Sequence, residues 1–125
     1  MSFIISFDPN DGIVTAKVSG KATHDEHYAA RDEALRICRE NDCINLLVDL
    51  RELLTDRSSA MDCFAFGESF AQMSPKARIA HVLPIDAKSR EDVKFTSDVC
   101  ANRGLLTREF ETVDQARSWL LAANA

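Results

Sequence analysis

The sequence predicts an α/β domain, and three observations support this fold class. Segments of strand length alternate with segments of helical length along most of the chain, as in sheets built from parallel strands and crossover helices. Two of the helical segments begin with capping boxes. The chain opens with two alternating apolar segments joined by Pro9-Asn10-Asp11-Gly12, which is typical of a β-hairpin. We therefore expect a single-domain five-stranded mixed sheet with an N-terminal β-hairpin and four helices, in the order ββαβαβαβα.

Length and composition indicate one ordinary globular domain covering residues 1–125. The hydrophobic fraction of 46% and the charged fraction of 28% are typical of a soluble protein with a real core. A net charge of −5 argues against nonspecific binding to nucleic acid. Because no apolar run is long enough to span a bilayer and Met1–Ile5 lacks the basic segment of a signal peptide, we expect a cytoplasmic protein.

The first part of the chain predicts a hairpin followed by a helix. The hairpin strands are expected at Ser2–Asp8 and Ile13–Ser19. Thr23 and Glu26 have the spacing of a capping box, in which the hydroxyl and the carboxylate each accept a backbone N–H of the other residue. A helix is therefore expected from this box to about Glu40.

The middle of the chain predicts a buried strand that leads into a helix. The apolar run Ile44–Leu50 is too short for a good helix and is expected as a strand. Arg51–Arg57 is expected as a loop, with Ser58 or Ser59 as the N-cap of a helix that ends near Met73. Ligand sites of open α/β sheets lie at such carboxyl ends of strands.

The last part of the chain repeats the strand and helix alternation. A strand is expected at Ala77–Leu83, a helix at Ser89–Arg103 and a strand at Leu105–Phe110. The second capping box, Thr112–Gln115, begins a last helix that ends near Ala123.

The helix that ends near Met73 has an unusually wide apolar surface, roughly half of its circumference, where packing on one sheet needs a stripe of roughly 100°. The helix is either wedged between the sheet and a neighbouring helix, or it forms a pocket or exposed patch for a lipid-like ligand, a partner or a membrane surface. Gly67 within it indicates a close approach. The candidate ligand-binding residues are Met61, Phe64, Phe66, Phe70, Met73, Phe95 and Arg31.

Three stretches, taken in order, resemble one known family. They are Leu46–Arg51, Phe95–Gly104 and Phe110–Leu120. Their order and spacing resemble the SpoIIAA-like proteins, a bacterial group related in fold to the STAS domains of anti-sigma-factor antagonists. The resemblance implies a mixed sheet of five strands with helices on its faces. Because SpoIIAA-like proteins are similar to lipid-binding Sec14-like domains, it also implies an apolar ligand pocket between helices.

The resemblance to anti-sigma-factor antagonists implies an alternative function. In those proteins a serine at the helix start is phosphorylated by a partner kinase, and Ser58 or Ser59 matches that position. The family pattern is Asp-Ser-Ser-Gly, whereas here Arg57 lies between Asp56 and Ser58, and Ala60 stands in place of the glycine. The alternative is therefore a protein-interaction module that binds an anti-sigma-factor-like kinase and is switched by phosphorylation.

The remaining polar residues do not form a recognisable catalytic pattern. No Ser-His-Asp order, phosphate-binding loop or dinucleotide turn is present, so we expect no enzyme and no cofactor. His24 and His27 share a helix face but lack a third metal ligand, so no metal is expected. His81 is expected as a hydrogen-bonded core residue. Asp49 and Arg51 are spaced either for an ion pair or for contact with a ligand.

Two further points depend on composition rather than on a motif. The four cysteines form no CxxC pair, and we expect them to be small buried hydrophobic residues in a reducing compartment. Arg31 lies in the apolar arc of the first helix, where it can snorkel, pair with an acid or bind an anionic head group. We expect a non-enzymatic binding or regulatory domain that takes a hydrophobic small molecule or a membrane surface, with peripheral membrane attachment and a homodimer left open.

Overall fold

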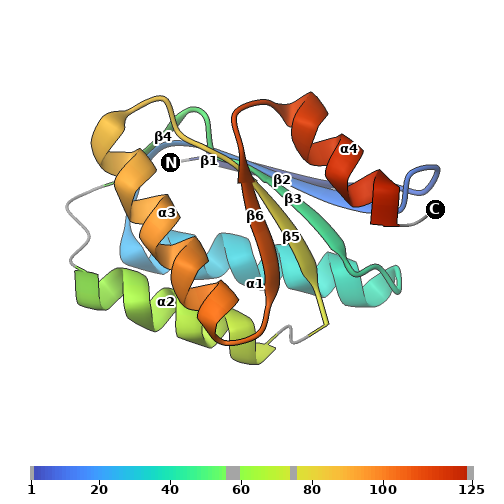
Figure 1. Ribbon diagram of the computed structural model, residues 1–125, viewed down its shortest axis with the longest axis horizontal. Coiled ribbons are helices and arrows are strands. Elements are labelled where there is room, and N and C mark those ends of the chain that lie inside the picture. The colour runs from blue at the N-terminus through green and yellow to red at the C-terminus, as the bar shows by residue number, and fades with distance from the viewer. Residues whose placement is uncertain (1, 56–59, 74–75, 124–125) are drawn as a thin grey trace.

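The computed structural model of the chain describes residues 2–55, 60–73 and 76–123, which form a mixed sheet with helices on both faces (Figure 1). The described strands are β1 (Ser2–Asp8), β2 (Ile13–Ala22), β3 (Asn45–Asp49), β4 (Leu53–Thr55), β5 (Arg78–Val82) and β6 (Leu106–Phe110). The described helices are α1 (His24–Glu40), α2 (Ala60–Met73), α3 (Ala87–Asn102) and α4 (Val113–Ala123). The predicted α/β class, with its N-terminal hairpin, is confirmed.

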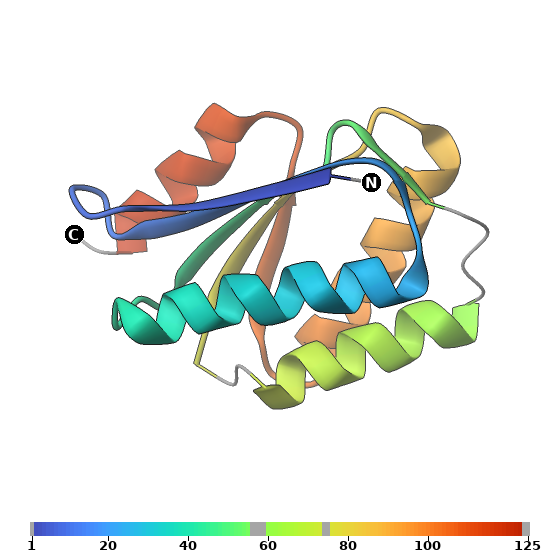
Figure 2. The same ribbon diagram turned by 180° about the vertical axis from the view of Figure 1, so that it is seen from behind.

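The main sheet has the strand order β1-β2-β3-β5-β6. The hairpin strands β1 and β2 are antiparallel, whereas the pairs β2–β3, β3–β5 and β5–β6 are parallel. Crossovers between parallel strands are right-handed, and here three of them step across the sheet in the same direction. This places α1, α2 and α3 together on one face, while α4 covers the other (Figures 1 and 2).

The first predicted capping box is present in full, whereas the second is present only in part. Thr23 Oγ1 accepts the Glu26 N–H at 3.2 Å, and the Glu26 carboxylate accepts the Thr23 N–H at 2.9 Å. Thr112 Oγ1 likewise accepts the Gln115 N–H at 3.2 Å. The Gln115 side chain, however, accepts the N–H of Glu111, one residue earlier than the usual box requires.

The predictions for the end of β2 and for the loop after β3 are wrong. β2 does not end at Ser19 but continues to Ala22, because Gly20–Ala22 pairs in parallel with β4. β4 itself, Leu53–Thr55, lies inside the segment expected as a loop. β2 and β4 therefore extend the sheet past the end of β3.

The start of α3 also differs from the prediction. α3 begins at Ala87 rather than at Ser89. The reason is its N-cap, since the Asp86 carboxylate accepts the Ser89 N–H at 3.0 Å and the Ser89 hydroxyl at 2.8 Å.

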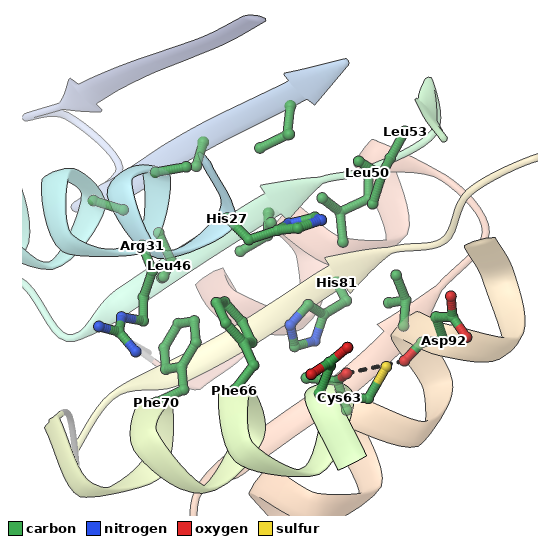
Figure 3. Close-up of a pocket in the computed structure, with 18 residues that line it drawn as sticks. His27, Arg31, Leu46, Leu50, Leu53, Cys63, Phe66, Phe70, His81 and Asp92 are labelled. Carbon is green, nitrogen blue, oxygen red and sulfur yellow. Dashed lines mark hydrogen bonds between the residues drawn. The ribbon is translucent and has the colours of Figure 1, made fainter. Parts of the chain in front are cut away.

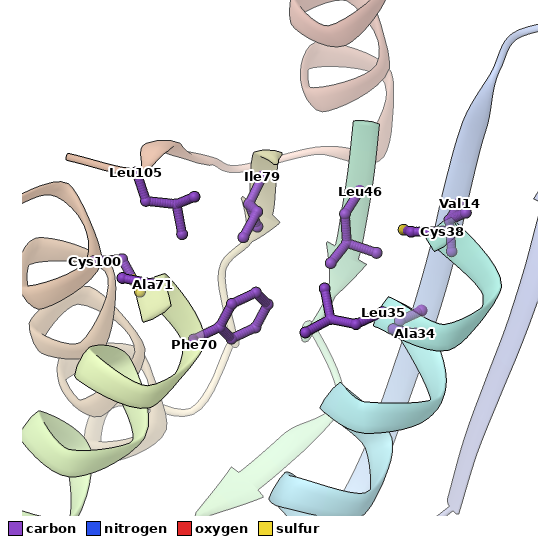
Figure 4. Packing of buried hydrophobic residues seen from close by; sticks show 11 residues of the cluster. Val14, Ala34, Leu35, Cys38, Leu46, Phe70, Ala71, Ile79, Cys100 and Leu105 are labelled. Atoms are coloured by element: carbon purple, nitrogen blue, oxygen red, sulfur yellow. The ribbon is translucent and has the colours of Figure 1, made fainter. Parts of the chain in front are cut away.

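Buried side chains between the sheet and α1–α3 form a large core cluster (Figure 4). Leu46 of β3 and Phe70 of α2 both belong to this cluster. The neighbouring Leu47 points to the opposite face, into a second cluster beneath α4 that includes Ala116 and Leu120. Because β3 is covered on both faces, its middle residues Leu46–Val48 are all apolar rather than alternating with polar residues.

α2 packs mainly against α3 and lies farther from the sheet than α1 does (Figure 2). Gly67 makes this packing close, since a Cβ on Gly67 would lie 2.9 Å from the Thr96 carbonyl oxygen and 3.0 Å from Val99 Cβ. The close approach predicted from this glycine is confirmed. This contact holds α2 against α3, and the Phe66 and Phe70 side chains extend from α2 toward the sheet.

Candidate functional site

A pocket of about 110 Å³ lies between the sheet and the helices α1, α2 and α3 (Figure 3). One water molecule needs only about 10–15 Å³ of such volume. Close-packed protein interiors contain few voids larger than a water molecule. A pocket of this size is therefore unusual for a core region, and its lining decides what it can hold.

The floor of the pocket is apolar and comes from the sheet. Alternate residues of a strand face the same side, so β2 and β3 each present small or branched side chains toward α1–α3. These floor residues are Ala16, Val18, Leu46 and Val48, together with Leu50 and Leu53 beyond the end of β3.

One wall consists of aromatic rings from α2 and α1. Phe66 and Phe70 extend from α2 toward the sheet (Figure 3), with ring centroids 5.9 Å apart. The Phe66 ring also lies 5.1 Å from the Tyr28 ring and 6.0 Å from the His27 ring, at steep angles. Edge-to-face contacts of this kind add stability beyond area burial. The rings therefore form a connected, rigid surface on this side of the pocket.

Arg31 closes one end of the pocket and is only 7% exposed. Its Nη1 donates to Ser69 Oγ at 2.8 Å, and its Nε and Nη2 donate to Asp32 Oδ1 at 3.0 and 2.6 Å. The guanidinium carbon also lies 4.6 Å from the centroid of the Tyr28 ring. Of the three roles left open by the sequence, the structure shows pairing with an acid. Because the guanidinium is already engaged, Arg31 positions α1 against α2.

The opposite end of the pocket is polar (Figure 3). Asp62 and Cys63 of α2 and Asp92 and Thr96 of α3 line it. Asp92 is buried and accepts a hydrogen bond from Lys88 Nζ at 2.9 Å. Burial raises the pKa of the Cys63 thiol despite a hydrogen bond with Thr96, so this thiol is protonated near neutral pH and is a poor nucleophile.

His81 of β5 lies at this polar end and is 8% exposed. Its Nδ1 lies 3.1 Å from Thr107 Oγ1 on β6, and Thr107 Oγ1 lies 3.2 Å from Ser97 Oγ on α3. Burial lowers the pKa of His81 to about 4, so the ring is uncharged at neutral pH. His81 is thus a hydrogen-bonded buried residue, as its position in the sequence predicts, and it also faces the pocket.

The structure brings together three of the candidate ligand-binding residues predicted from sequence. Phe66, Phe70 and Arg31 line the pocket. Three others do not line the pocket and are exposed to solvent. They are Met61 (81% exposed), Phe64 (43%) and Phe95 (41%). The wide apolar surface of α2 is therefore divided between a side that faces the pocket and a side that faces solvent.

Other candidates lie outside the described residues. These are the side chain of Met73 and the whole of Ser58 and Ser59. The predicted serine switch therefore stays a prediction.

The polar end of the pocket was not identified from the sequence. Asp62 groups with the outward polar residues of its helix, and Asp92 has no distinguishing neighbour in the sequence. One signal was present, since His81 is a polar residue inside an otherwise buried strand, between Ala80 and Val82. A single histidine of this kind is usually a structural residue, and only the helices packed over it make it part of a pocket.

Asp49 and Arg51 form an ion pair, with Asp49 Oδ1 and Oδ2 each 2.9 Å from a guanidinium nitrogen. Burial acts to raise the pKa of Asp49, but the hydrogen bonds from Arg51 outweigh it and leave that pKa below its ordinary value. Cys38, Cys63 and Cys100 are buried and free, as predicted, while Cys43 is half-buried and free. Within the described residues no group of three acidic, histidine or cysteine side chains is arranged to hold a metal ion.

No protein-family model matches the chain, and no curated protein sequence matches it. Among the described residues, no helix has the length and apolar character needed to cross a membrane.

Proposed function

We propose that this protein is a non-enzymatic binding domain for a small, mainly apolar ligand, held in the pocket between the sheet and α1–α3. The observation that carries the proposal is the pocket itself, about 110 Å³ of space with an apolar floor, an aromatic wall and a polar end. Ligand sites of proteins combine an apolar lining with a few polar groups in this way.

The volume bounds the size of the ligand. An engineered apolar cavity of about 150 Å³ binds benzene. The pocket of about 110 Å³ is smaller, so it is suited to a molecule no larger than a single small ring, or to the end of a longer molecule that leaves the pocket. The pocket is a better candidate than the surface of α2, because Phe66 and Phe70 face inward and are among its lining residues.

The polar side chains support binding rather than catalysis. The Cys63 thiol is protonated near neutral pH, and Asp92 is paired with Lys88. His81 has its Nδ1 bonded to a threonine hydroxyl rather than to a carboxylate that would orient it as a base.

Toluene, which has seven non-hydrogen atoms, is a suitable probe for this proposal. Its binding can be followed by NMR titration of the side-chain methyl groups, among which Leu46 and Val93 line the pocket. We expect saturable shifts at these methyl groups. The absence of saturable shifts would overturn the proposal.

A pair of matched substitutions locates the binding. Ala30 lines the pocket and is 6% exposed, whereas its neighbour Ala29 is exposed on the same helix. Ala30→Leu places three extra carbon atoms in the pocket and should abolish toluene binding. Ala29→Leu should leave it unchanged. Equal binding by both variants would place toluene elsewhere on the protein.

A second candidate function is the phosphorylation-switched interaction module. One observation favours it, since α2 begins at Ala60, directly after Ser59 in the sequence. A phosphate placed just before a helix N-terminus is favoured by the helix dipole. The test is the intact mass of protein purified from its own host, with and without phosphatase treatment. A phosphate increment that is lost in a Ser58→Ala or Ser59→Ala variant would support this candidate, and an unmodified mass would count against it.

A further inference from the structure

The hydrogen-bond chain behind His81 determines what this ring presents to the pocket. The chain runs from Ser97 Oγ through Thr107 Oγ1 to His81 Nδ1, with separations of 3.2 and 3.1 Å. Ser97 is 2% exposed and His81 is 8% exposed, so bulk water does not readily complete these bonds. Within the described residues these are the hydrogen bonds that the structure gives to the three side chains.

Counting the hydrogens in this chain favours one direction. If His81 Nδ1 carried the hydrogen, it would donate to Thr107, and Thr107 would donate to Ser97. The Ser97 hydroxyl hydrogen would then have no acceptor within the described residues. In the opposite direction Ser97 donates to Thr107, Thr107 donates to Nδ1, and both hydroxyl hydrogens are used. Since a buried donor without an acceptor is costly, the second direction is preferred.

The preferred direction puts the ring hydrogen on Nε2. The ring of His81 lies between Phe66 and Cys63 in the pocket (Figure 3), and no described residue is hydrogen-bonded to Nε2. The polar end of the pocket therefore presents the Nε2–H of His81 as a hydrogen-bond donor next to the apolar floor. A ligand that fills the pocket without an acceptor would leave this donor unpaired.

Charge at the same end of the pocket limits the ligand further. Burial keeps His81 uncharged at neutral pH, and Asp62 and Asp92 line the same end, where Asp92 is paired with Lys88 Nζ at 2.9 Å. A carboxylate or phosphate ligand would lose its hydration in this mainly apolar pocket and would find no positive charge on His81, so its binding would be costly. The Arg31 guanidinium is bonded to Asp32 and Ser69 at the other end, so it does not offset this cost.

We infer that the ligand is a small uncharged molecule with an apolar body and a carbonyl-type oxygen, which accepts a hydrogen bond from Nε2–H of His81. This inference rests on the proposed function, because it assigns a ligand class to the same pocket. It adds a chemical selectivity that an apolar pocket alone would not have.

The first experiment needs no ligand. A long-range ¹H–¹⁵N correlation spectrum of the full chain identifies the tautomer of His81 from the shifts of its two ring nitrogens. The expected result at pH 7 is a protonated Nε2 and an unprotonated Nδ1. A protonated Nδ1 would overturn the inference while leaving the pocket proposal intact.

The second experiment compares two probes of nearly the same shape. Cyclopentanone and methylenecyclopentane differ by an oxygen in place of a CH₂ group, and both have six non-hydrogen atoms. We expect the Nε2–H resonance to move downfield when cyclopentanone binds and to stay in place when methylenecyclopentane binds. We also compare the affinity for cyclopentanone with that for methylenecyclopentane. In His81→Phe this ketone-to-alkene ratio should be about fivefold lower than in the unmodified protein.

The outcomes separate the two proposals. If neither probe binds, the proposed function fails together with its ligand class. If both bind in the pocket but Nε2–H does not respond to the ketone, only the inference about the ligand fails. Tighter binding of cyclopentanecarboxylate than of cyclopentanone would overturn it as well. The Nε2–H response is measured on the unmodified protein, so it decides the question even where His81→Phe does not fold.

Discussion

Arg31 of α1 donates a hydrogen bond to Ser69 of α2 at 2.8 Å and thereby adds a polar contact to the ring contacts between the two helices. The bond lies at one end of the pocket, so it fixes how far α2 stands from α1. Because the guanidinium is charged and 7% exposed, losing an acceptor here matters more than losing one at the surface.

Replacing Ser69 should therefore weaken the protein measurably. We expect Ser69→Ala to lower the free energy of unfolding by about 1 kcal/mol, because Arg31 keeps its bonds to Asp32 but loses one acceptor. Urea unfolding at neutral pH measures the effect. Ser118→Ala is the matched control, since Ser118 is exposed on α4 and should change stability by less than about 0.5 kcal/mol. Similar small effects of both variants would show that the Arg31–Ser69 bond contributes little.

At Gly67, helix propensity and helix packing have opposite effects on the stability of an alanine variant. Alanine is favoured over glycine in a helix by about 1 kcal/mol, but a Cβ at this position would lie 2.9 Å from the Thr96 carbonyl oxygen. Overpacking of this kind typically costs about 1–3 kcal/mol. We therefore expect Gly67→Ala to lower the free energy of unfolding by about 1 kcal/mol.

The matched comparison for Gly67 is Ala65→Gly at an exposed position of the same helix. This change measures the difference in helix propensity between alanine and glycine at a side chain that is exposed to solvent. We expect it to lower the free energy of unfolding by about 1 kcal/mol. If Gly67→Ala instead stabilised the protein by the same amount, α2 would not be held as closely to α3 as the structure has it.

Because His81 is buried, we expect the stability of the protein to depend on pH in a specific way. Burial lowers its pKa from 6.5 to about 4 in the folded protein, whereas the unfolded chain keeps the ordinary value. Well above pH 6.5 the ring is neutral in both states and does not change the stability. As the pH falls below that value, the unfolded state binds a proton that the folded state does not, so the folded protein becomes less stable.

The size of this effect is about 1.5 kcal/mol between pH 6.5 and about pH 5, where most carboxylates are still charged. Urea unfolding across this range should show the loss in the unmodified protein and a much smaller one in His81→Phe. Identical pH profiles for the two proteins would mean that His81 is not buried in uncharged form.

Much of the fold could be predicted because its signals are local. The Thr23–Glu26 capping box and the apolar run of β3 depend on residues that are neighbours in sequence, and both are present as expected. β4 was missed because it has three residues, and its pairing with Gly20–Ala22 is a long-range contact that no local pattern encodes. Short strands of this kind are defined by their partner rather than by their own sequence.

The pocket could be predicted only in part, for a physical reason. The width of the apolar surface of α2 indicates that something other than one sheet covers it, but not which rings face inward. That depends on the rotation of α2 on α3, which the close contact of Gly67 with Val99 sets. The same rotation brings Asp62 and Cys63 to the pocket, although the helical pattern groups Asp62 with the outward side.

The division of α2 into two sides gives the sharpest test of the pocket. Phe66 lines the pocket, whereas Phe64, two residues earlier, is 43% exposed with the Arg103 guanidinium carbon 5.6 Å from its ring centroid. Phe66→Ala should cost about 2 kcal/mol or more in unfolding free energy and weaken toluene binding about tenfold, because it removes a ring from the wall. Phe64→Ala should cost less than about 1 kcal/mol and leave toluene binding unchanged.

Measuring both variants by urea unfolding and by the methyl NMR titration distinguishes a pocket from an apolar patch. A ligand in the pocket contacts Phe66 and not Phe64, so only the first change alters the affinity. A surface that uses the outward side of α2 would respond in the opposite way, since Met61 and Phe64 are the exposed apolar side chains there. Equal weakening by both variants would mean that the ligand spans the two sides, which the pocket of about 110 Å³ does not allow without a movement of α2.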